Sequence, residues 1–316
     1  MPFIRFFIFL ILALFLLSAL KNFLIKFAIE TASPGIIGAK IEMGDFSLGV
    51  LTHRIHIKNF RLYNPPGFPD QVFLVMPEVM VDVDMMELIK GRMHFPWVVL
   101  NLDKMVIVKN KEGKLNVDSL KIVQEEQAAN KGKPMKLPVF KIDLLDLNIG
   151  KVVMEDHTHA PPVRVEAYDV GIKNQKIRNI NGLPKLVACV LVEAMKPTAI
   201  RSAGLYAAET LLGVGFLPAL AIGIAVAKDD VNADLNHPFG TVYQETLKLV
   251  QELGTVKKAD GQKGQILAKV YGCDITINLQ DTGWGKSHIR IKAREYFLAK
   301  LEIANGLLYQ LTERLK

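Results

Sequence analysis

The sequence predicts an α+β protein, and three observations lead to this class. A long uncharged apolar run opens the chain, alternating strand patterns fill its middle, and a helix–strand–helix order ends it. We therefore expect an N-terminal transmembrane helix, a curved antiparallel sheet, an apolar helical segment and a small α+β domain. The corresponding ranges are residues 1–31 (anchor), 36–180 (β-rich domain), 183–228 (apolar helical segment) and 231–316 (helix–three-strand–helix domain).

The first segment has the composition of a membrane anchor. Residues 6–20 hold no charge and one polar residue, Ser18. With their apolar flanks they approach the roughly 20 residues that a bilayer crossing needs. A cleaved signal peptide needs two closely spaced small residues, and residues 17–20 supply no such pair, so we expect a retained helix. Arg5 on one side and Lys21 and Lys26 on the other leave the orientation open.

The middle of the chain alternates with a period of two from Ser33, Pro34 and Gly35 onward, which indicates strands. One face of each strand is apolar and the other polar, as in antiparallel sheets. A short helix at residues 85–90 and another at 118–126, capped by Asn116 or Asp118, interrupt the strands.

Two strands change phase partway, which predicts bends in the sheet. Ile57 is followed by Phe60, and Leu144 by Leu145, so each strand turns its apolar side chains to the other face. A curved sheet with a continuous apolar face forms either a groove or an ordinary core covered by helices, and the residue pattern alone favours the core. The candidate groove-lining residues are Ile55, Ile57, Val79, Val81, Val83, Leu100, Leu102, Phe140 and Ile142.

A family resemblance rests on four segments in a fixed order. They contain an Asn-Pro-Pro-Gly-Phe element, a valine–aspartate strand followed by a short helix, and a glycine–aspartate turn between two later strands. Together with the apolar N-terminal run, these segments resemble the AsmA family of bacterial envelope proteins over roughly the first half of the chain. The segments are residues 59–71, 76–95, 102–121 and 147–156.

The resemblance implies a location and a role. Members of this family hold their N-terminal helix in the inner membrane and their body in the periplasm. Their superfamily folds as a rolled sheet with a greasy groove, and it is implicated in phospholipid transport or outer-membrane assembly. The implied partner is the acyl chain of a membrane phospholipid. This chain is much shorter than the large members, so it would act locally, self-associate, or extend a partner's groove through an edge strand.

A second apolar segment, residues 203–227, is long enough to span a bilayer. It contains Glu209, which costs a few kcal/mol inside hydrocarbon. It is a second transmembrane helix, a helix at the interface or in the groove, or a buried helical hairpin broken at Pro218. The charge favours a membrane-associated or groove-lining helix.

The last region reads as a separate domain. Pro238 opens a helix whose apolar face holds Val242, Leu249 and Leu253, and Gly254 stops it. Three alternating strands follow, and a final helix places Phe297 and Leu301 on one apolar stripe. The domain resembles a family of uncharacterised small bacterial domains carried on lipoproteins, and we expect an interaction module.

The chemistry-bearing side chains have ordinary explanations. Residues 285–287, Gly-Lys-Ser, lack the earlier glycine of a phosphate loop and read as a hairpin turn. His157 and His159 lie before two prolines in a turn, and His53 and His56 flank apolar strand residues, so we expect solvent-facing side chains.

The solvent-facing side of a strand explains the acidic cluster of Asp82, Asp84 and Glu87 without any catalytic role. Cys189 and Cys273 either pair or are buried thiols. The net charge of +7 is scattered, which argues against nucleic acid.

We therefore expect a protein that is not an enzyme and has no metal or cofactor. The first hypothesis is lipid handling through the groove. The alternative is a membrane-tethered scaffold that binds another envelope protein through residues 231–316.

Overall fold

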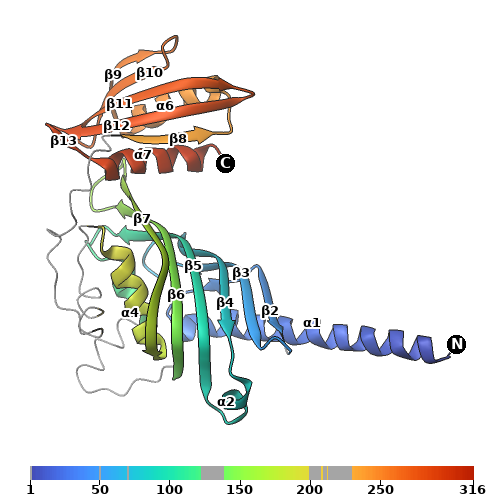
Figure 1. Cartoon of the computed structure of the whole chain (residues 1–316). Coiled ribbons are helices and arrows are strands. Elements are labelled where there is room, and N and C mark those ends of the chain that lie inside the picture. Colours follow the sequence, from blue (N-terminus) through green and yellow to red (C-terminus); the bar gives the residue numbers. More distant parts are fainter. Residues whose placement is uncertain are drawn as a thin grey trace.

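The computed structural model describes residues 2–49, 51–69, 71–121, 139–198, 208, 212 and 230–316, with side chains from residue 19 onward (Figure 1). The chain is α+β, as predicted, with two curved sheets and helices packed on them. The long helix α1 (Pro2–Ile36) leaves the first sheet at one edge and points away from the body.

Helix α1 continues through Ser33, Pro34 and Gly35, where the sequence predicted a change to strand. Pro34 lacks the N–H that would bond the carbonyl of Glu30. The Ser33 hydroxyl donates to that carbonyl instead, over 2.9 Å, and this bond allows one more helical turn.

The predicted anchor, residues 6–20, lies in α1. The structure describes side chains only from residue 19 onward, so nearly all side chains of the predicted anchor lie outside the described part. A search of the described residues finds no helix with both the length and the apolar character needed to cross a membrane.

Seven strands form the first sheet among the described residues. β1 and β2 are two pieces of one edge strand, because both pair with β3. The rest follow in the order β3-β4-β5-β6-β7. The strands are β1 (Ile41–Glu42), β2 (Asp45–Gly49), β3 (Arg54–Tyr63), β4 (Val72–Asp82), β5 (Met93–Lys109), β6 (Phe140–Asp156) and β7 (Arg164–Asn181).

The expected all-antiparallel pairing is wrong at one place. β5 and β6 run parallel, with Met93 opposite Phe140 and Lys109 opposite Asp156. A parallel pair needs a crossover of a dozen or more residues, and residues 110–139 separate these strands. Periodicity reports which face a side chain occupies but not the direction of the strand, so the alternation could not reveal this.

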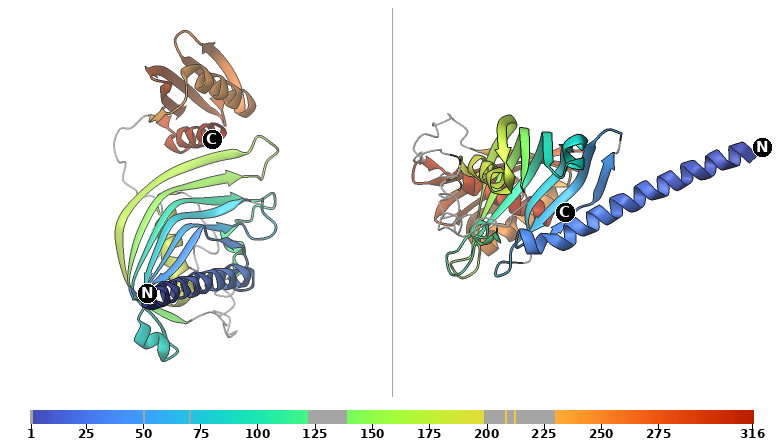
Figure 2. Two further views of the ribbon diagram at one scale, coloured as in Figure 1. Left: turned by 90° about the vertical axis from the view of Figure 1, so that its right-hand side faces the viewer. Right: turned by 90° about the horizontal axis from the view of Figure 1, so that it is seen from below.

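The predicted phase changes are present and coincide with the curvature. Ile57 and Phe60 both pack against the same apolar core, as do Ile142 and Leu145. Asn59, between the first two, has a left-handed φ of 51°. Seen from the side to which α1 points, the strands arch in one direction and helix α4 (Gly182–Met195) lies inside the arch (Figure 2).

Two short helices follow strands of this sheet. α2 (Met85–Ile89) begins at Asp84, whose carboxylate accepts from the N–H groups of Met86 and Glu87. At the start of the expected helix at 118–126 the structure has a 3-10 helix η1 (Val117–Ser119) with Asn116 as its cap, and Lys121 is helical. Residues 122–126 lie outside the described residues.

The second apolar segment lies outside the described residues except at two positions. Ala208 and Leu212 are helical; Ala208 is buried in the core of the first sheet and Leu212 packs against it. At these two positions the segment therefore contacts the concave side of the sheet.

The C-terminal unit has more strands than the predicted three. The sheet order is β13-β12-β11-β10-β9, and β8 pairs with β12 beside β13. We missed β9 because its sequence, GTVKKAD, has almost no apolar alternation. The elements are β8 (Val231–Leu235), α6 (Phe239–Leu253), β9 (Gly254–Asp260), β10 (Gln265–Val270), β11 (Cys273–Gly283), β12 (Lys286–Glu295), β13 (Leu298–Ala299) and α7 (Leu301–Arg314).

The two helices of this unit cover its sheet. The predicted face of α6 is confirmed, since Val242, Thr246, Leu249, Val250 and Leu253 are all buried. The prediction for the last helix is wrong at its start. Phe297 lies in the β12–β13 hairpin and is exposed, because α7 begins only at Leu301.

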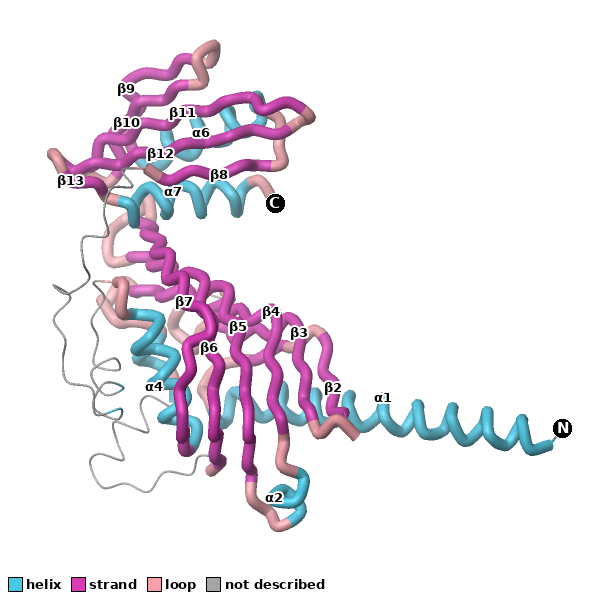
Figure 3. Tube along the Cα trace, viewed as in Figure 1, coloured by secondary structure: helices cyan, strands magenta, loops and turns pink. Residues whose placement is uncertain are grey.

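The two units meet where α7 crosses the start of β7, and Figure 3 shows α7 between the sheets. A Cβ atom on Gly306 would lie 2.2 Å from the carbonyl oxygen of Val165, so only glycine permits this approach. The Tyr271 hydroxyl donates to the carbonyl of Val163 over 2.6 Å. The ammonium of Lys104 lies 5.0 Å from the ring centroid of Tyr309.

Candidate functional site

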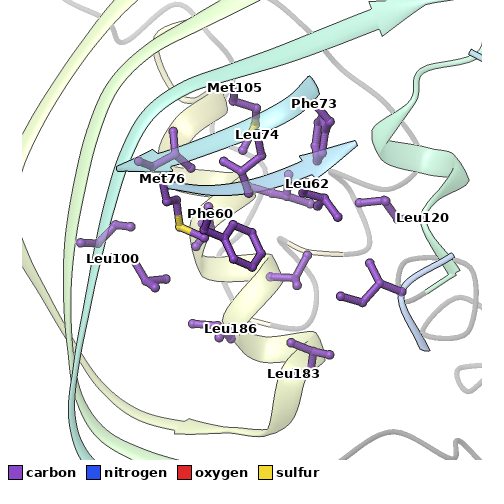
Figure 4. A pocket seen from close by; sticks show the side chains of 16 residues that line it. Phe60, Leu62, Phe73, Leu74, Met76, Leu100, Met105, Leu120, Leu183 and Leu186 are labelled. Atoms are coloured by element: carbon purple, nitrogen blue, oxygen red, sulfur yellow. The ribbon is translucent and has the colours of Figure 1, made fainter. Parts of the chain in front are cut away.

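An apolar cavity of about 200 Å³ lies between α4 and the concave face of the first sheet (Figure 4). Side chains from the strands and from α4 point into the same space, and all of them are hydrocarbon or thioether groups. The lining residues are Ile37, Phe60, Leu62, Phe73, Leu74, Met76, Leu100, Leu102, Met105, Leu120, Leu147, Leu183, Leu186, Val187, Val190 and Leu191.

Helix α4 is placed over the sheet by the turn at the end of β7. Gly182, with φ of 78°, directly follows Asn181, the last residue of β7, and reverses the chain into the arch. The helix then presents Leu183, Leu186, Val187, Val190 and Leu191 to the cavity. These positions follow the i, i+3, i+4, i+7 spacing of one helical face.

That helical face does not seal the sheet. Ala188, Ala194 and Met195 are fully buried against the strands. Leu183, Leu186, Val187 and Val190 are only half-buried, although they face the same sheet. The volume between these four residues and the strands is the cavity.

The strands supply a deformable floor. Met76 and Met105 lie on β4 and β5 beside the stiffer Leu74 and Leu102. Methionine has an unbranched, polarizable side chain that adapts to irregular shapes. A cavity with two methionines in its floor can adjust to guests of different curvature.

Of the nine predicted groove residues, Leu100 and Leu102 line the cavity. Val79 and Ile142 are buried in the core beside it, and Val83 is buried beyond the end of β4. The remaining four are half-buried at the edge of the same core: Ile55, Ile57, Val81 and Phe140.

The predicted residues are buried or half-buried in the apolar core, but most of them do not border the cavity. The cavity is beyond the bend in β3 and β4, at Phe60, Leu62, Leu74 and Met76. The phase change between Ile57 and Phe60 was the available signal, because Phe60 and Leu62 beyond it line the cavity and Ile57 before it does not. The five α4 positions depend on the tertiary placement of that helix.

The polar groups lie apart from the cavity, paired with one another. Asp82 accepts from Arg54 at 2.6 Å, and His56 Nε2 lies 2.7 Å from Glu78. Hydrogen bonds from Arg92 and Lys90 lower the pKa of Glu87 to about 2. The acidic cluster of the sequence is therefore a set of ion pairs and a helix cap.

His94 lies between two carboxylates at one end of the first sheet. Its Nε2 lies 2.8 Å from Asp143 Oδ2 and its Nδ1 lies 3.1 Å from Asp84 Oδ2. The hydrogen bond with Asp143 raises the pKa of His94. This triad ties α2 to β5 and β6.

The remaining sequence candidates do not converge. His157 lies 3.3 Å from Glu155, and His159 contacts Thr158. Within the described parts of the chain, no group of three or more His, Cys, Asp or Glu side chains is arranged to hold a metal ion; the two carboxylates at His94 lie on opposite nitrogens of its ring. Residues 283–286 form the predicted hairpin turn, and Cys189 and Cys273 are buried free thiols in different units.

The edge of the first sheet at β1 and β2 is closed by α1. Side chains of Asn22, Glu30 and Ser33 accept hydrogen bonds from edge N–H groups over 2.7–3.1 Å. Lys21 and Lys26 donate to edge carbonyls. These bonds use backbone groups that would otherwise pair with another chain.

The other edge strand, β7, is interrupted rather than covered in its middle. Gly171, Asn174 and Asn179 have left-handed φ values of 62°, 53° and 57°. Such residues break a regular ladder and discourage strand addition.

Comparison of the sequence with models of known families and with curated proteins finds no match. The cavity therefore has to be interpreted by its own chemistry. An engineered apolar cavity of about 150 Å³ stays dry and binds benzene. The present cavity is larger and equally apolar, so it suits a hydrocarbon guest.

Proposed function

We propose that this chain is a membrane-anchored, AsmA-like protein that handles membrane lipid by holding part of an acyl chain between α4 and the curved sheet. The observation that carries the proposal is the wholly apolar cavity under a half-buried helical face. The anchor would be the first part of α1, and the body would lie in the periplasm of a bacterial envelope.

The size of the cavity limits the guest. Pockets that enclose a drug-sized molecule have volumes of about 300 Å³ or more. The 200 Å³ found here corresponds to one acyl segment of roughly six to eight carbons, judged from the benzene-binding cavity. At about 0.8 kcal/mol for each buried methylene, that segment contributes about 5 kcal/mol before the cost of ordering it.

The arrangement of α1 supports a route from the membrane. The strands arch around the direction of α1, so the concave side of the sheet runs along this helix (Figures 1 and 2). Five side chains of α1 are bonded to the β1–β2 edge, which fixes the angle between helix and sheet. A membrane around the first part of α1 would then face one end of the concave side of the sheet.

The proposal is tested by the lipid that accompanies the full chain. We expect native mass spectrometry of the full chain, extracted with its surrounding lipid, to show one co-bound phospholipid or fatty acid. In Val190→Trp the indole would occupy the cavity, and we expect at least a tenfold loss of bound lipid. Leu51→Trp is the matched control, because Leu51 is 95% exposed and outside the cavity.

Equal lipid in all three proteins would mean that the lipid surrounds the anchor and does not enter the cavity. The proposal is wrong if the wild-type chain carries no lipid and a spin-labelled fatty acid enters the cavity of none of the three proteins.

A further inference from the structure

The C-terminal unit carries a small aromatic tip. The β12–β13 hairpin ends in Tyr296 and Phe297, which are 91% and 96% exposed to solvent. The next residue, Leu298, is 70% exposed. Leaving three consecutive large apolar side chains in water forgoes the free energy that their burial would contribute. The C-terminal core does not include any of them.

The backbone of the tip is arranged to present these side chains. Glu295 pairs with Leu298, so Tyr296 and Phe297 alone form the loop. Tyr296 has φ of 54°, a left-handed conformation that glycine or asparagine adopts at lower cost. An aromatic residue at such a position is strained, and Trp284 at the β11–β12 tip shares this conformation, so the neighbouring charge and the direction of the hairpin distinguish the two tips.

A row of cations leads to the tip. Arg290, Lys292 and Arg294 alternate along β12 and therefore share one face of the strand. Asp230 pairs with the first two, at 3.0 and 4.0 Å. Lys300 follows the hairpin and contacts Glu295 at 3.1 Å. Asp274 on β11 lies opposite Arg294 and pairs with Lys257 at 2.5 Å, so cations still outnumber carboxylates along this row.

The direction of the tip separates it from the anchor. The β12–β13 hairpin points to the side of the molecule opposite the N-terminus of α1 (Figures 1 and 3). A membrane around the first part of α1 therefore cannot reach Phe297. The contact of α7 with β7 at Gly306 joins this unit to the first sheet.

We infer that the hairpin tip of Tyr296, Phe297 and Leu298 inserts into the headgroup region of a second, anionic lipid surface, on the far side of the molecule from α1. Aromatic side chains concentrate at the boundary between headgroups and hydrocarbon. Basic residues beside them add attraction to anionic headgroups. One chain would then contact two lipid surfaces, with the cavity-bearing sheet between them.

The test uses the full chain in nanodiscs of phosphatidylcholine, floated with separate vesicles of phosphatidylcholine and phosphatidylglycerol. We expect the wild-type chain to float with the vesicles. Replacing both tip aromatics, Tyr296→Ser with Phe297→Ser, should reduce flotation roughly tenfold.

Trp284→Ser is the matched control. Trp284 is 99% exposed at the β11–β12 tip, also has a left-handed φ, and that hairpin points toward the side of α1's N-terminus. We expect this variant to float as the wild type does. An equal loss in both variants would show unspecific adhesion of exposed aromatics and overturn the inference.

The second part of the test varies the lipid composition of the vesicles. Vesicles of phosphatidylcholine alone should bind several-fold less wild-type chain, because they do not attract the basic row. Equal binding to both vesicles, or no flotation of the wild type with either, contradicts the inference. The Val190→Trp variant should float normally, so the outcome does not depend on lipid in the cavity.

Discussion

The two sheets of this protein differ in how completely their helices cover them. In the C-terminal unit, the apolar face of α6 is buried along its whole length, with Leu249 and Val250 fully enclosed. In the first sheet, α4 buries Ala194 and Met195 but leaves Leu186 and Val190 half-buried over a void. Both helices are amphipathic and both sheets alternate.

The difference shows that a closed core and an apolar cavity can arise from the same alternating sequence pattern. What separates them is how fully the helical side chains are buried against the sheet, since four half-buried residues of α4 border an open space. The first sheet arches around α4, and Asn59, whose left-handed backbone lies between Ile57 and Phe60, marks the phase change in β3 (Figure 2).

The largest effect should come from truncating equivalent leucines under the two helices. Leu249→Ala removes a side chain of a residue that is 1% exposed, so the free energy of unfolding should fall by about 2–5 kcal/mol. Leu186→Ala should lower it by about 1 kcal/mol or less, since this side chain already faces space. Urea unfolding followed by circular dichroism measures both; equal losses would mean that the cavity does not persist in solution.

The junction between the two units should be the next most sensitive place. Gly306→Ala puts a methyl group against the carbonyl oxygen of Val165, and we expect a loss of about 1–3 kcal/mol together with faster amide exchange in β7. Gly240→Ala is the control, because it lies in α6 with nothing within 4 Å of the added Cβ atom. We expect it to be neutral or stabilising by up to about 1 kcal/mol.

A larger side chain should destabilise the C-terminal unit but not the first sheet. Ala268→Leu overpacks the sealed C-terminal core and should cost about 1–3 kcal/mol. Val190→Trp fills a space that already exists, so the thermal midpoint should stay the same or rise. A loss as large as that of Ala268→Leu would show that α4 already packs tightly on the strands.

The smallest effect concerns the end of the first sheet, where His94 joins α2 to β6. Its folded-state pKa is raised, first by the hydrogen bond with Asp143, so its contribution is complete below the unfolded value of about 6.5. That contribution is lost as the pH rises through the higher folded value.

The pKa of Asp143 is lowered, first by Lys141 and then by His94, so its own contribution is lost only as the pH falls through its folded value. The difference in urea midpoint between wild type and His94→Gln should therefore be present at about pH 5.5 and smaller at about pH 9. A difference that grows toward high pH would contradict this account.

Much of the fold could be predicted from local pattern. The buried face of α6 followed from its helical spacing, and the cap of α2 at Asp84 coincides with the end of a strand pattern. Strand β9 and the parallel pairing of β5 with β6 could not be predicted, because one has almost no alternation and the other depends on a long connection.

The site was predicted less well for a physical reason. Alternation places Leu100 and Val81 on the same face, and both do contact the same core. Only the bend and the placement of α4 decide that Leu100 lines a cavity and Val81 does not. Those are tertiary properties that one strand does not contain.

The most direct measurement is the position at which a lipid tail contacts the chain. A fatty acid with a diazirine near its methyl end can be bound to the full chain, irradiated, and located by peptide mass spectrometry. The account predicts adducts on α4 and on β4 or β5, at or beside Leu186, Met76 and Met105, and their loss in Val190→Trp. Adducts confined to α1, unchanged in that variant, would contradict it.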